Sequence, residues 1–264
     1  MPLARADLES LLRTRHLDRT LTTALPPTSD DQVVAPTGVS TLDAGLGGGF
    51  PRGQLSELVG PRSSGRTSLL LHALAAATAR GELVALIDAL DMLDVESAAA
   101  AGIDLDRMLW IRGHVVSNPG MCRDLNQRAL EQAIRAFTLV LQAGNFGVVV
   151  FDVAEAPADA VRRLPFTTWL RVQRMVEGSP TACVLVGSEP MARSSAGLTV
   201  RTGISPSTSS GRPECAEGRD LGLGIRFCEQ LFDGLNVEAK VVRARARAHE
   251  EATVALTTVA SHCA

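Results

Sequence analysis

The sequence predicts an α/β fold with a mainly parallel sheet flanked by helices, and three observations support this. A glycine-rich turn, residues 60–68, joins a strand-like run to a helix-like run. Continuous apolar runs typical of buried parallel strands recur at residues 83–87, 147–151 and 182–186. Amphipathic spacing typical of a helix lies between them, most clearly at residues 123–143. Strands that alternate with helices in this way indicate a parallel sheet with helical crossovers.

Chain length and composition indicate one large domain or a domain with appendages. The chain has 264 residues, 45% of them hydrophobic, and a formal net charge of −3, so it can bury a core without disulfides. Because the balance is not basic, any contact with nucleic acid requires a local patch. The five cysteines are scattered without a CxxC pair, and we see neither a signal peptide nor an apolar run that could span a membrane. We therefore expect a cytoplasmic protein with no membrane partner.

The chain divides into four parts. Residues 1–20 place three leucines on one side of a short helix, which either packs on its own domain or docks on a partner or a neighbouring subunit. Residues 21–36 contain Pro and Thr and are expected to form an extended linker. The α/β core follows over residues 37–190. Residues 191–264 are expected to hold a Gly-, Ser- and Pro-rich loop at 201–222 and then antiparallel edge strands.

The glycine-rich turn has the spacing of a phosphate-binding loop. Gly60, four residues and Gly65 are followed by Arg66 and Thr67, which completes G-x-x-x-x-G-K-[ST] with arginine in place of lysine. Backbone N–H groups of such a loop point into one concavity at a helix N-terminus, which favours an anion. We expect Arg66 to approach the β- and γ-phosphates and Thr67 to offer its hydroxyl to Mg²⁺. The alternative is a Gly/Ser turn that caps an ordinary helix.

An acidic residue at the end of a buried strand is the second part of this predicted site. Asp152 follows the apolar run 147–151, and after a phosphate loop such a residue is expected to hold Mg²⁺, directly or through water. The alternative is a helix cap or a solvated strand end. His72 lies in the helix after the loop, and we expect it to pack in the core rather than bind a ligand.

Three arginines near the carboxyl end alternate at period two. Arg243, Arg245 and Arg247 therefore fall on one side of a predicted strand. We favour the solvated face of an edge strand as their interpretation. The alternative is a patch that contacts DNA or an acidic partner protein.

At this point the residues resemble a known family. The run from Thr37 to Asp94, beginning TGVSTLDAGLGGGFPRG, is similar to the ATPase core of RecA-type recombinases, and the similarity extends through GIDLDRMLWIRG and GVVVFD, over about residues 37–190. It implies a RecA-like P-loop NTPase core that binds ATP with Mg²⁺. The carboxyl part, LFDGLNVEAKVVRARARA, and the phrase LWIRG look more like ImuA, the RecA-related accessory family of damage-induced mutagenesis cassettes.

The resemblance assigns roles residue by residue. It implies that the nucleotide contacts come from Gly60, Ser63, Ser64, Gly65, Arg66, Thr67, Ser68 and Asp94. It implies that Thr67 and Asp152 are the metal ligands.

Several groups that the family uses for turnover are replaced here. Leu90 stands where the catalytic glutamate is expected, and Ser97 where an aromatic residue stacks on adenine. The glutamine that senses the γ-phosphate is replaced near Ser188 and Glu189. Loss of a water-orienting base lowers a rate by ~10²–10⁴-fold. We therefore assign no catalytic residue and expect weak or absent hydrolysis.

The resemblance implies one function and leaves two alternatives. The first is an accessory or adaptor protein of the SOS response and translesion DNA synthesis, which contacts a polymerase-like partner, RecA or DNA and is a candidate homo-oligomer. The second is an active DNA-dependent ATPase or recombinase that uses Asp91 or Glu189 as its catalytic residue. The third is a structural relic that binds no nucleotide.

Overall fold

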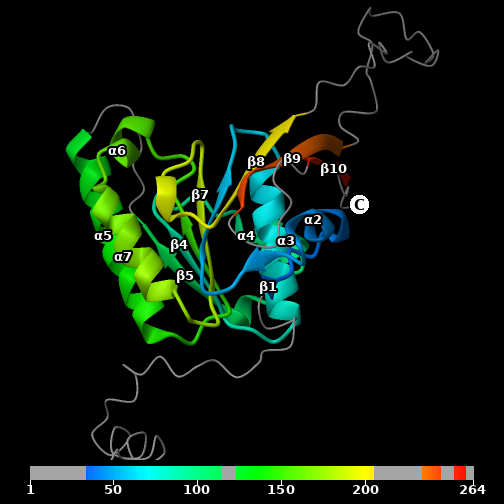
Figure 1. Ribbon diagram of the computed structural model, residues 1–264, viewed down its shortest axis with the longest axis horizontal. Coiled ribbons are helices and arrows are strands. Elements are labelled where there is room, and N and C mark those ends of the chain that lie inside the picture. The colour runs from blue at the N-terminus through cyan, green and yellow to red at the C-terminus, as the bar shows by residue number, and fades with distance from the viewer. Residues whose placement is uncertain (1–33, 114–122, 205–233, 245–252, 260–264) are drawn as a thin grey trace, which may run out of the picture.

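The computed structural model describes residues 34–113, 123–204, 234–244 and 253–259 (Figure 1). Two short strands, β1 (Val34–Ala35) and β2 (Phe50–Pro51), pair antiparallel beside the main sheet. The strands of the main sheet are β3 (Leu55–Val59), β4 (Val84–Asp88), β5 (Met108–Arg112), β6 (Val148–Asp152), β7 (Ala182–Gly187), β8 (Leu198–Ile204), β9 (Gly234–Ala244) and β10 (Thr253–Val259). The helices are α2 (Ser40–Leu46), α3 (Arg66–Ala79), α4 (Val95–Ala100), α5 (Arg123–Ala143), α6 (Ala158–Arg162) and α7 (Phe166–Val176).

The main sheet has eight strands in the order β10-β9-β8-β3-β7-β6-β4-β5. The six strands from β8 to β5 are parallel, whereas β9 and β10 are antiparallel to their neighbours. This confirms the predicted α/β class with antiparallel C-terminal strands. The strand β7 lies between the glycine-loop strand β3 and the strand β6 that ends at Asp152. The carboxyl ends of all three therefore meet at one edge of the sheet.

Helices cover both faces of the sheet, because successive strand residues point to opposite sides. On one face Leu58, Val150 and Val184 pack with α2, α3 and α4, and on the other Leu55, Phe151 and Leu185 pack with α5 and α7 (Figure 1). Phe151 stacks on Phe137 of α5 at 5.0 Å and meets Trp169 of α7 edge-on at 6.1 Å. This double-sided core fixes the strand ends that carry the candidate site.

The structure changes some local expectations. Helix α5 has the bounds that its periodicity predicts. Strand β8 runs to Ile204, so the first residues of the loop expected at 201–222 are strand, because they pair with β9. Strand β9 pairs on both sides and β10 lies outside it, so the arginine-bearing strand is not an edge. His72 was expected in the core and is exposed on α3.

Other expectations fall outside the described residues. These are the helix at 1–20, the linker at 21–33 and the rest of the loop at 205–222. Within the part of the chain that the structure describes, no helix combines the length and apolarity needed to cross a bilayer.

Candidate phosphate-binding site

The glycine-rich loop joins β3 to α3, as its spacing predicts. The Gly60 N–H donates to the Gly187 carbonyl of β7 at 3.1 Å, which ties the loop to the neighbouring strand end. Gly65 precedes the first turn of α3 with φ 77°, a left-handed conformation that glycine adopts without a Cβ penalty. Ser63 also lies in that region, at φ 59°. The loop therefore has the tight backbone course that a phosphate cradle requires.

The two motif glycines are also required by the protein's own packing. A Cβ on Gly60 would lie 2.3 Å from Thr202 Oγ1, and one on Gly65 would lie 2.3 Å from Val237 Cγ2. Thr202 of β8 shares a hydrogen bond with the buried Ser64, at 2.7 Å between the two hydroxyl oxygens. Because β8 and β9 press on the loop, glycine at 60 and 65 has a structural explanation that needs no phosphate.

Arg66 is folded back into the protein. Its side chain is 5% exposed, and Nη1 donates to the Gly60 carbonyl and, at 3.1 Å, to the Gly187 carbonyl. Nη2 pairs with Glu155 Oε1 at 3.3 Å. One guanidinium nitrogen thus bridges the ends of β3 and β7, while the other reaches Glu155, so the planar fork serves three acceptors at once.

Glu155 is the site residue that sequence reasoning missed. It lies between β6 and α6, pairs with Arg66 and also pairs with the exposed Arg62 of the loop. One carboxylate, with its side chain 18% exposed, therefore faces both arginines of the phosphate loop. Arg66 and Glu155 are 89 positions apart, so the only sequence signal was an acid three residues after Asp152.

Asp152 ends β6 in register with Asp88 of β4. Its Oδ1 accepts the Ala154 N–H at 2.8 Å, and Asp88 Oδ2 accepts the Leu93 N–H at 2.8 Å. Burial raises the pKa of Asp152 to about 6; the Ala154 N–H opposes this shift and the nearby Asp88 carboxylate adds to it. Asp152 is therefore a carboxylate that takes up a proton near pH 6 unless a cation stabilises its charge.

Thr67 and Asp152 alone offer few oxygen ligands, so they suit Mg²⁺ only if phosphate oxygens and waters complete its coordination. Thr67 is exposed at the start of α3, and Asp152 supplies a hard carboxylate. Among the residues described here, no group of three or more His, Cys, Asp or Glu side chains is placed to hold a metal ion. Mg²⁺ commonly uses one or two carboxylates with waters and substrate phosphates. Thr67 and Asp152 fit that pattern.

The residues on the predicted adenine side contact each other. Asp94 is the N-cap of α4, where its carboxylate accepts the Ser97 N–H at 3.1 Å and the Ser97 hydroxyl. The Ser97 hydroxyl, followed by its N–H, lowers the pKa of Asp94. Ser97 stands where the resemblance places a stacking aromatic residue, so the structure gives Asp94 a capping role at an exposed helix start.

The three positions considered for a catalytic base are apolar or paired. Leu90 is 6% exposed and packs in the apolar core on the α5 side of the sheet. Asp91, at φ 58°, binds Arg112 through both carboxylate oxygens at 2.7 Å, and this hydrogen-bonded pair lowers the Asp91 pKa. Glu189 pairs with Arg162 at 2.8 Å. A carboxylate with a lowered pKa is a weaker base.

The carboxyl-terminal arginines are only partly described. Arg243 is exposed on β9, and its guanidinium donates to the carbonyl of Arg193. Arg245 and Arg247 lie outside the described residues. The contact joins β9 to the segment that follows β7.

Comparison with known proteins identifies the family. The family profile described as the RecA N-terminal domain matches residues 23–160. The RecA protein of Kineococcus radiotolerans is 30% identical over 221 residues, which cover 77% of this chain and 57% of that protein. The RecA protein of Salinispora tropica is 39% identical over 233 residues, covering 81% and 60%. The chain thus spans about three-fifths of the length of these relatives.

A solved structure agrees on the fold. The crystal structure of the RadB recombinase superposes with a TM-score of 0.53 at 16% identity, covering 84% of this chain and 94% of that one. At this identity the likeness concerns the fold alone. With the phosphate loop, the strand order and the family match taken together, the chain belongs to the RecA family of recombinase-like proteins.

Proposed function

We propose that this protein is an ImuA-like accessory protein of the SOS response and translesion DNA synthesis, which binds ATP with Mg²⁺ weakly and hydrolyses little or none. It would act in the cytoplasm by contacting a polymerase-like partner, RecA or DNA. The observation that carries the proposal is Leu90, an aliphatic side chain buried in the core at the position where the family resemblance places the catalytic glutamate.

Weak hydrolysis follows from what surrounds the loop. Attack of water on the γ-phosphate requires a group that orients the water and accepts its proton, and Leu90 can do neither. Asp91 and Glu189 are each paired with an arginine. Removing a base of this kind lowers the rate by ~10²–10⁴-fold.

Weak nucleotide binding follows from Glu155. The backbone of residues 60–67 with Ser68 would cradle the phosphates, and Thr67 and Asp152 would hold Mg²⁺, which neutralises phosphate charge and orients the oxygens when bound. Arg66 reaches those phosphates only after Glu155 releases it, because the guanidinium is already paired. The incoming negative charge must also overcome repulsion from the Glu155 carboxylate. The site therefore fits a nucleotide at a cost in affinity.

The decisive experiment measures turnover with and without single-stranded DNA. We expect phosphate release near background, and less than about a twofold rise when DNA is added. An increase of about tenfold or more on adding DNA would contradict the proposal. It would favour the second candidate, an active DNA-dependent ATPase. The retained spacing of the phosphate loop and Asp152 support that candidate. Asp91→Ala and Glu189→Ala would then identify the base.

Partner binding is tested separately. Deletion of residues 1–20 and the variant Arg243→Glu are compared with the full chain in pull-downs with RecA and a translesion polymerase, and in DNA retention assays. Loss of one contact with the others retained would locate that surface. Light scattering of the same variants reports homo-oligomer formation. Unchanged binding in every assay would contradict a role for these two regions.

A further inference from the structure

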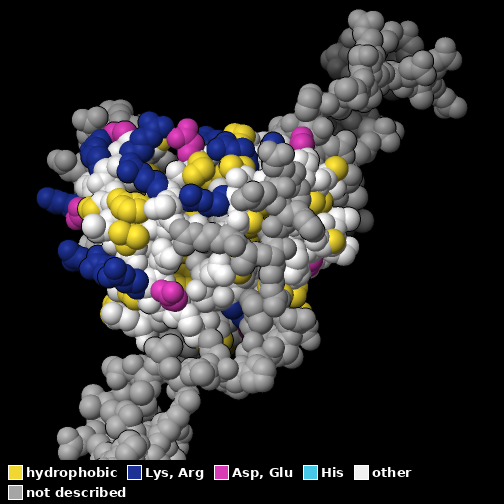
Figure 2. Space-filling view, viewed as in Figure 1, with side chains coloured by type: hydrophobic (Ala, Val, Ile, Leu, Met, Phe, Trp, Pro, Cys, Tyr) yellow, Lys and Arg dark blue, Asp and Glu magenta, His cyan; other side chains and the backbone are white. Residues whose placement is uncertain are grey.

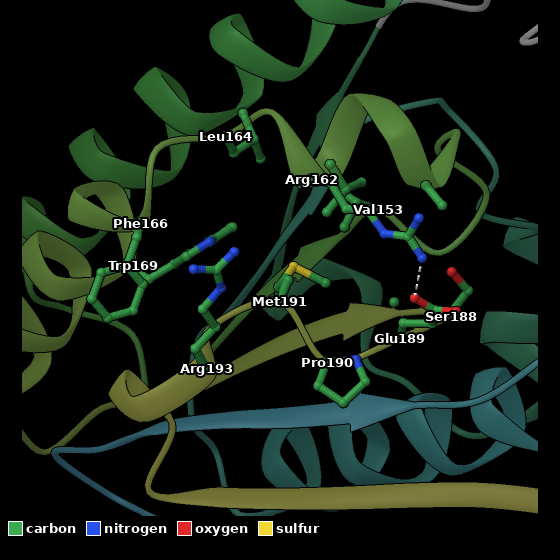
Figure 3. A pocket seen from close by; sticks show the side chains of 13 residues that line it. Val153, Arg162, Leu164, Phe166, Trp169, Ser188, Glu189, Pro190, Met191 and Arg193 are labelled. Atoms are coloured by element: carbon green, nitrogen blue, oxygen red, sulfur yellow. Dashed lines mark hydrogen bonds and ion pairs between the residues drawn. The ribbon is translucent and has the colours of Figure 1, made fainter.

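A cavity of about 230 Å³ lies at the carboxyl ends of β6 and β7. Its apolar lining comes from Val153, Leu164, Phe166, Trp169 and Met191, and Figure 3 shows Met191 between the aromatic side chains and Arg162. These residues come from the end of β6, from α7 and the turn before it, and from the segment after β7. This space is large enough for one large apolar side chain.

One wall of the cavity is fixed by a buried carboxylate. Glu57 of β3 is 1% exposed, and its Oε1 accepts the N–H groups of both Met191 and Ala192 at 2.7 Å. Its Oε2 accepts the Thr199 hydroxyl at 2.9 Å. Hydrogen bonds from backbone N–H groups to a charged acceptor are about twice as strong as neutral ones. The segment that carries Met191 is therefore held in place before any ligand binds.

The rim of the cavity carries two arginines, Arg162 and Arg193, and one carboxylate, Glu189. The Arg193 guanidinium lies 5.9 Å from the Phe166 ring centre, and Arg162 pairs with Glu189. Figure 2 shows arginine side chains gathered over α6 and α7, with apolar surface between them (compare Figure 1). The side chains of Arg162 and Glu189 are 69% and 59% exposed, so their pair is worth little and Arg162 can change partner.

We propose that this cavity is a docking site for an acidic peptide segment of a partner protein. The segment inserts one large apolar side chain beside Met191 and places carboxylates against Arg162 and Arg193. An apolar anchor in a pre-formed pocket with charged groups at the rim is a common hot-spot arrangement. The proposal does not require that the phosphate loop bind a nucleotide.

The chemistry favours a peptide over a nucleic acid. Bases bind through exposed aromatic faces and hydrogen-bonding groups. Here Trp169 is 2% exposed and Arg193 lies over Phe166. The Glu189 carboxylate at the rim repels a nucleic-acid backbone, which carries a charge at every nucleotide, whereas an acidic peptide can place its carboxylates at the arginines and an N–H group beside Glu189.

The test uses a synthetic peptide with one phenylalanine flanked by aspartate and glutamate, titrated into the full-length protein labelled at its methionine methyl groups. Six methionines give few signals, and Met191→Leu assigns that of Met191. We expect a saturable shift of the Met191 methyl with a Kd between about 10 μM and 1 mM. Replacing the phenylalanine by alanine should weaken binding about tenfold or more.

Three variants locate the site. Ala158→Trp fills the cavity from the exposed start of α6, and Arg193→Glu reverses a charge on the surface; each should weaken the peptide about tenfold or more. Arg174→Glu, an exposed position of α7 outside the lining, is the matched control and should change binding less than about twofold. Circular dichroism verifies folding, and Arg193→Glu keeps the test valid if Ala158→Trp does not fold.

Three outcomes would overturn the proposal. The first is no Met191 shift at about 1 mM peptide. The second is an equal loss in Arg174→Glu and Arg193→Glu, which would indicate diffuse charge attraction. The third is an oligo(dT) strand of about 15 nucleotides that shifts the Met191 methyl at lower concentration than the peptide, which would make this a nucleic-acid site.

Discussion

The phosphate loop and the cavity beside α7 lie at the same sheet edge but use their charges in opposite ways. In the loop, Glu155 pairs with both Arg62 and Arg66, and Arg66 is almost fully buried. At the cavity, Arg193 is exposed and Arg162 has only a solvent-exposed pair with Glu189, beside an apolar lining. The difference indicates that the loop satisfies its own charges, whereas the cavity presents cations and apolar surface to another molecule.

The largest expected effect is a loss of stability when Glu57, which holds one wall of the cavity, is replaced. Glu57→Ala leaves the N–H groups of Met191 and Ala192 without an acceptor, and we expect the free energy of unfolding to fall by about 3 kcal/mol or more. Urea unfolding measures this, with the exposed Glu131→Ala on α5 as a control that should change by less than about 0.5 kcal/mol. A loss below about 1 kcal/mol would show that the wall does not depend on this carboxylate.

At the phosphate loop, the buried Asp152 makes the stability of the protein depend on pH. The pKa of Asp152 is about 6 in the folded protein and about 3.9 when unfolded, so folding favours the protonated form. Its contribution to stability is therefore complete below about pH 4 and is lost as the pH rises through about 6, by up to about 3 kcal/mol. Asp152→Asn has no charge to desolvate. We expect it to be more stable than the wild type at about pH 8 and equal to it at about pH 4.

Chemical unfolding at the two pH values tests this expectation. A difference of the same size at both would show that the effect does not come from ionisation of Asp152. The Asn side chain keeps an acceptor for the Ala154 N–H, so loss of that hydrogen bond is controlled.

The internal pairing of the loop is tested with Glu155→Gln. The substitution keeps the size of the side chain and removes the charge that faces Arg66 and the phosphates. We expect Mg-ATP to bind about tenfold more tightly, or about 1.4 kcal/mol, in calorimetric titration. Glu131→Gln is the matched control and should bind as the wild type does. Weaker binding in Glu155→Gln would mean that the carboxylate supports the nucleotide site.

The smallest effect is expected at Asp91. Its carboxylate is held by Arg112, so Asp91→Asn should leave phosphate release within about twofold of the wild type. Asparagine tolerates the left-handed backbone at this position, so the fold is not strained. If phosphate release by the wild type is proportional to protein concentration and falls about tenfold or more in Asp91→Asn, Asp91 is the catalytic base.

Sequence patterns predicted the parts of this molecule that depend on neighbouring residues. The spacing of residues 60–67 located the loop, and helical periodicity gave the bounds of α5. The pairing of Glu155 with Arg66 was not predictable, because it depends on how two strand ends meet across β7. The same holds for the cavity, whose wall Glu57 fixes from β3. An alternating strand also looks the same at an edge and inside a sheet, which is why β9 was misplaced.

Gly187 has one consequence that spans the molecule. On one side its carbonyl receives Gly60 and Arg66, and on the other its missing side chain leaves room for the Met191 methyl, which would lie 2.5 Å from a Cβ. Gly187 therefore borders both the phosphate loop and the cavity. Suppose that a ligand at the phosphate loop displaces Gly187 and so changes the affinity of the cavity for its peptide. Thermodynamic reciprocity then requires that the peptide change the affinity of the loop for its ligand by the same factor.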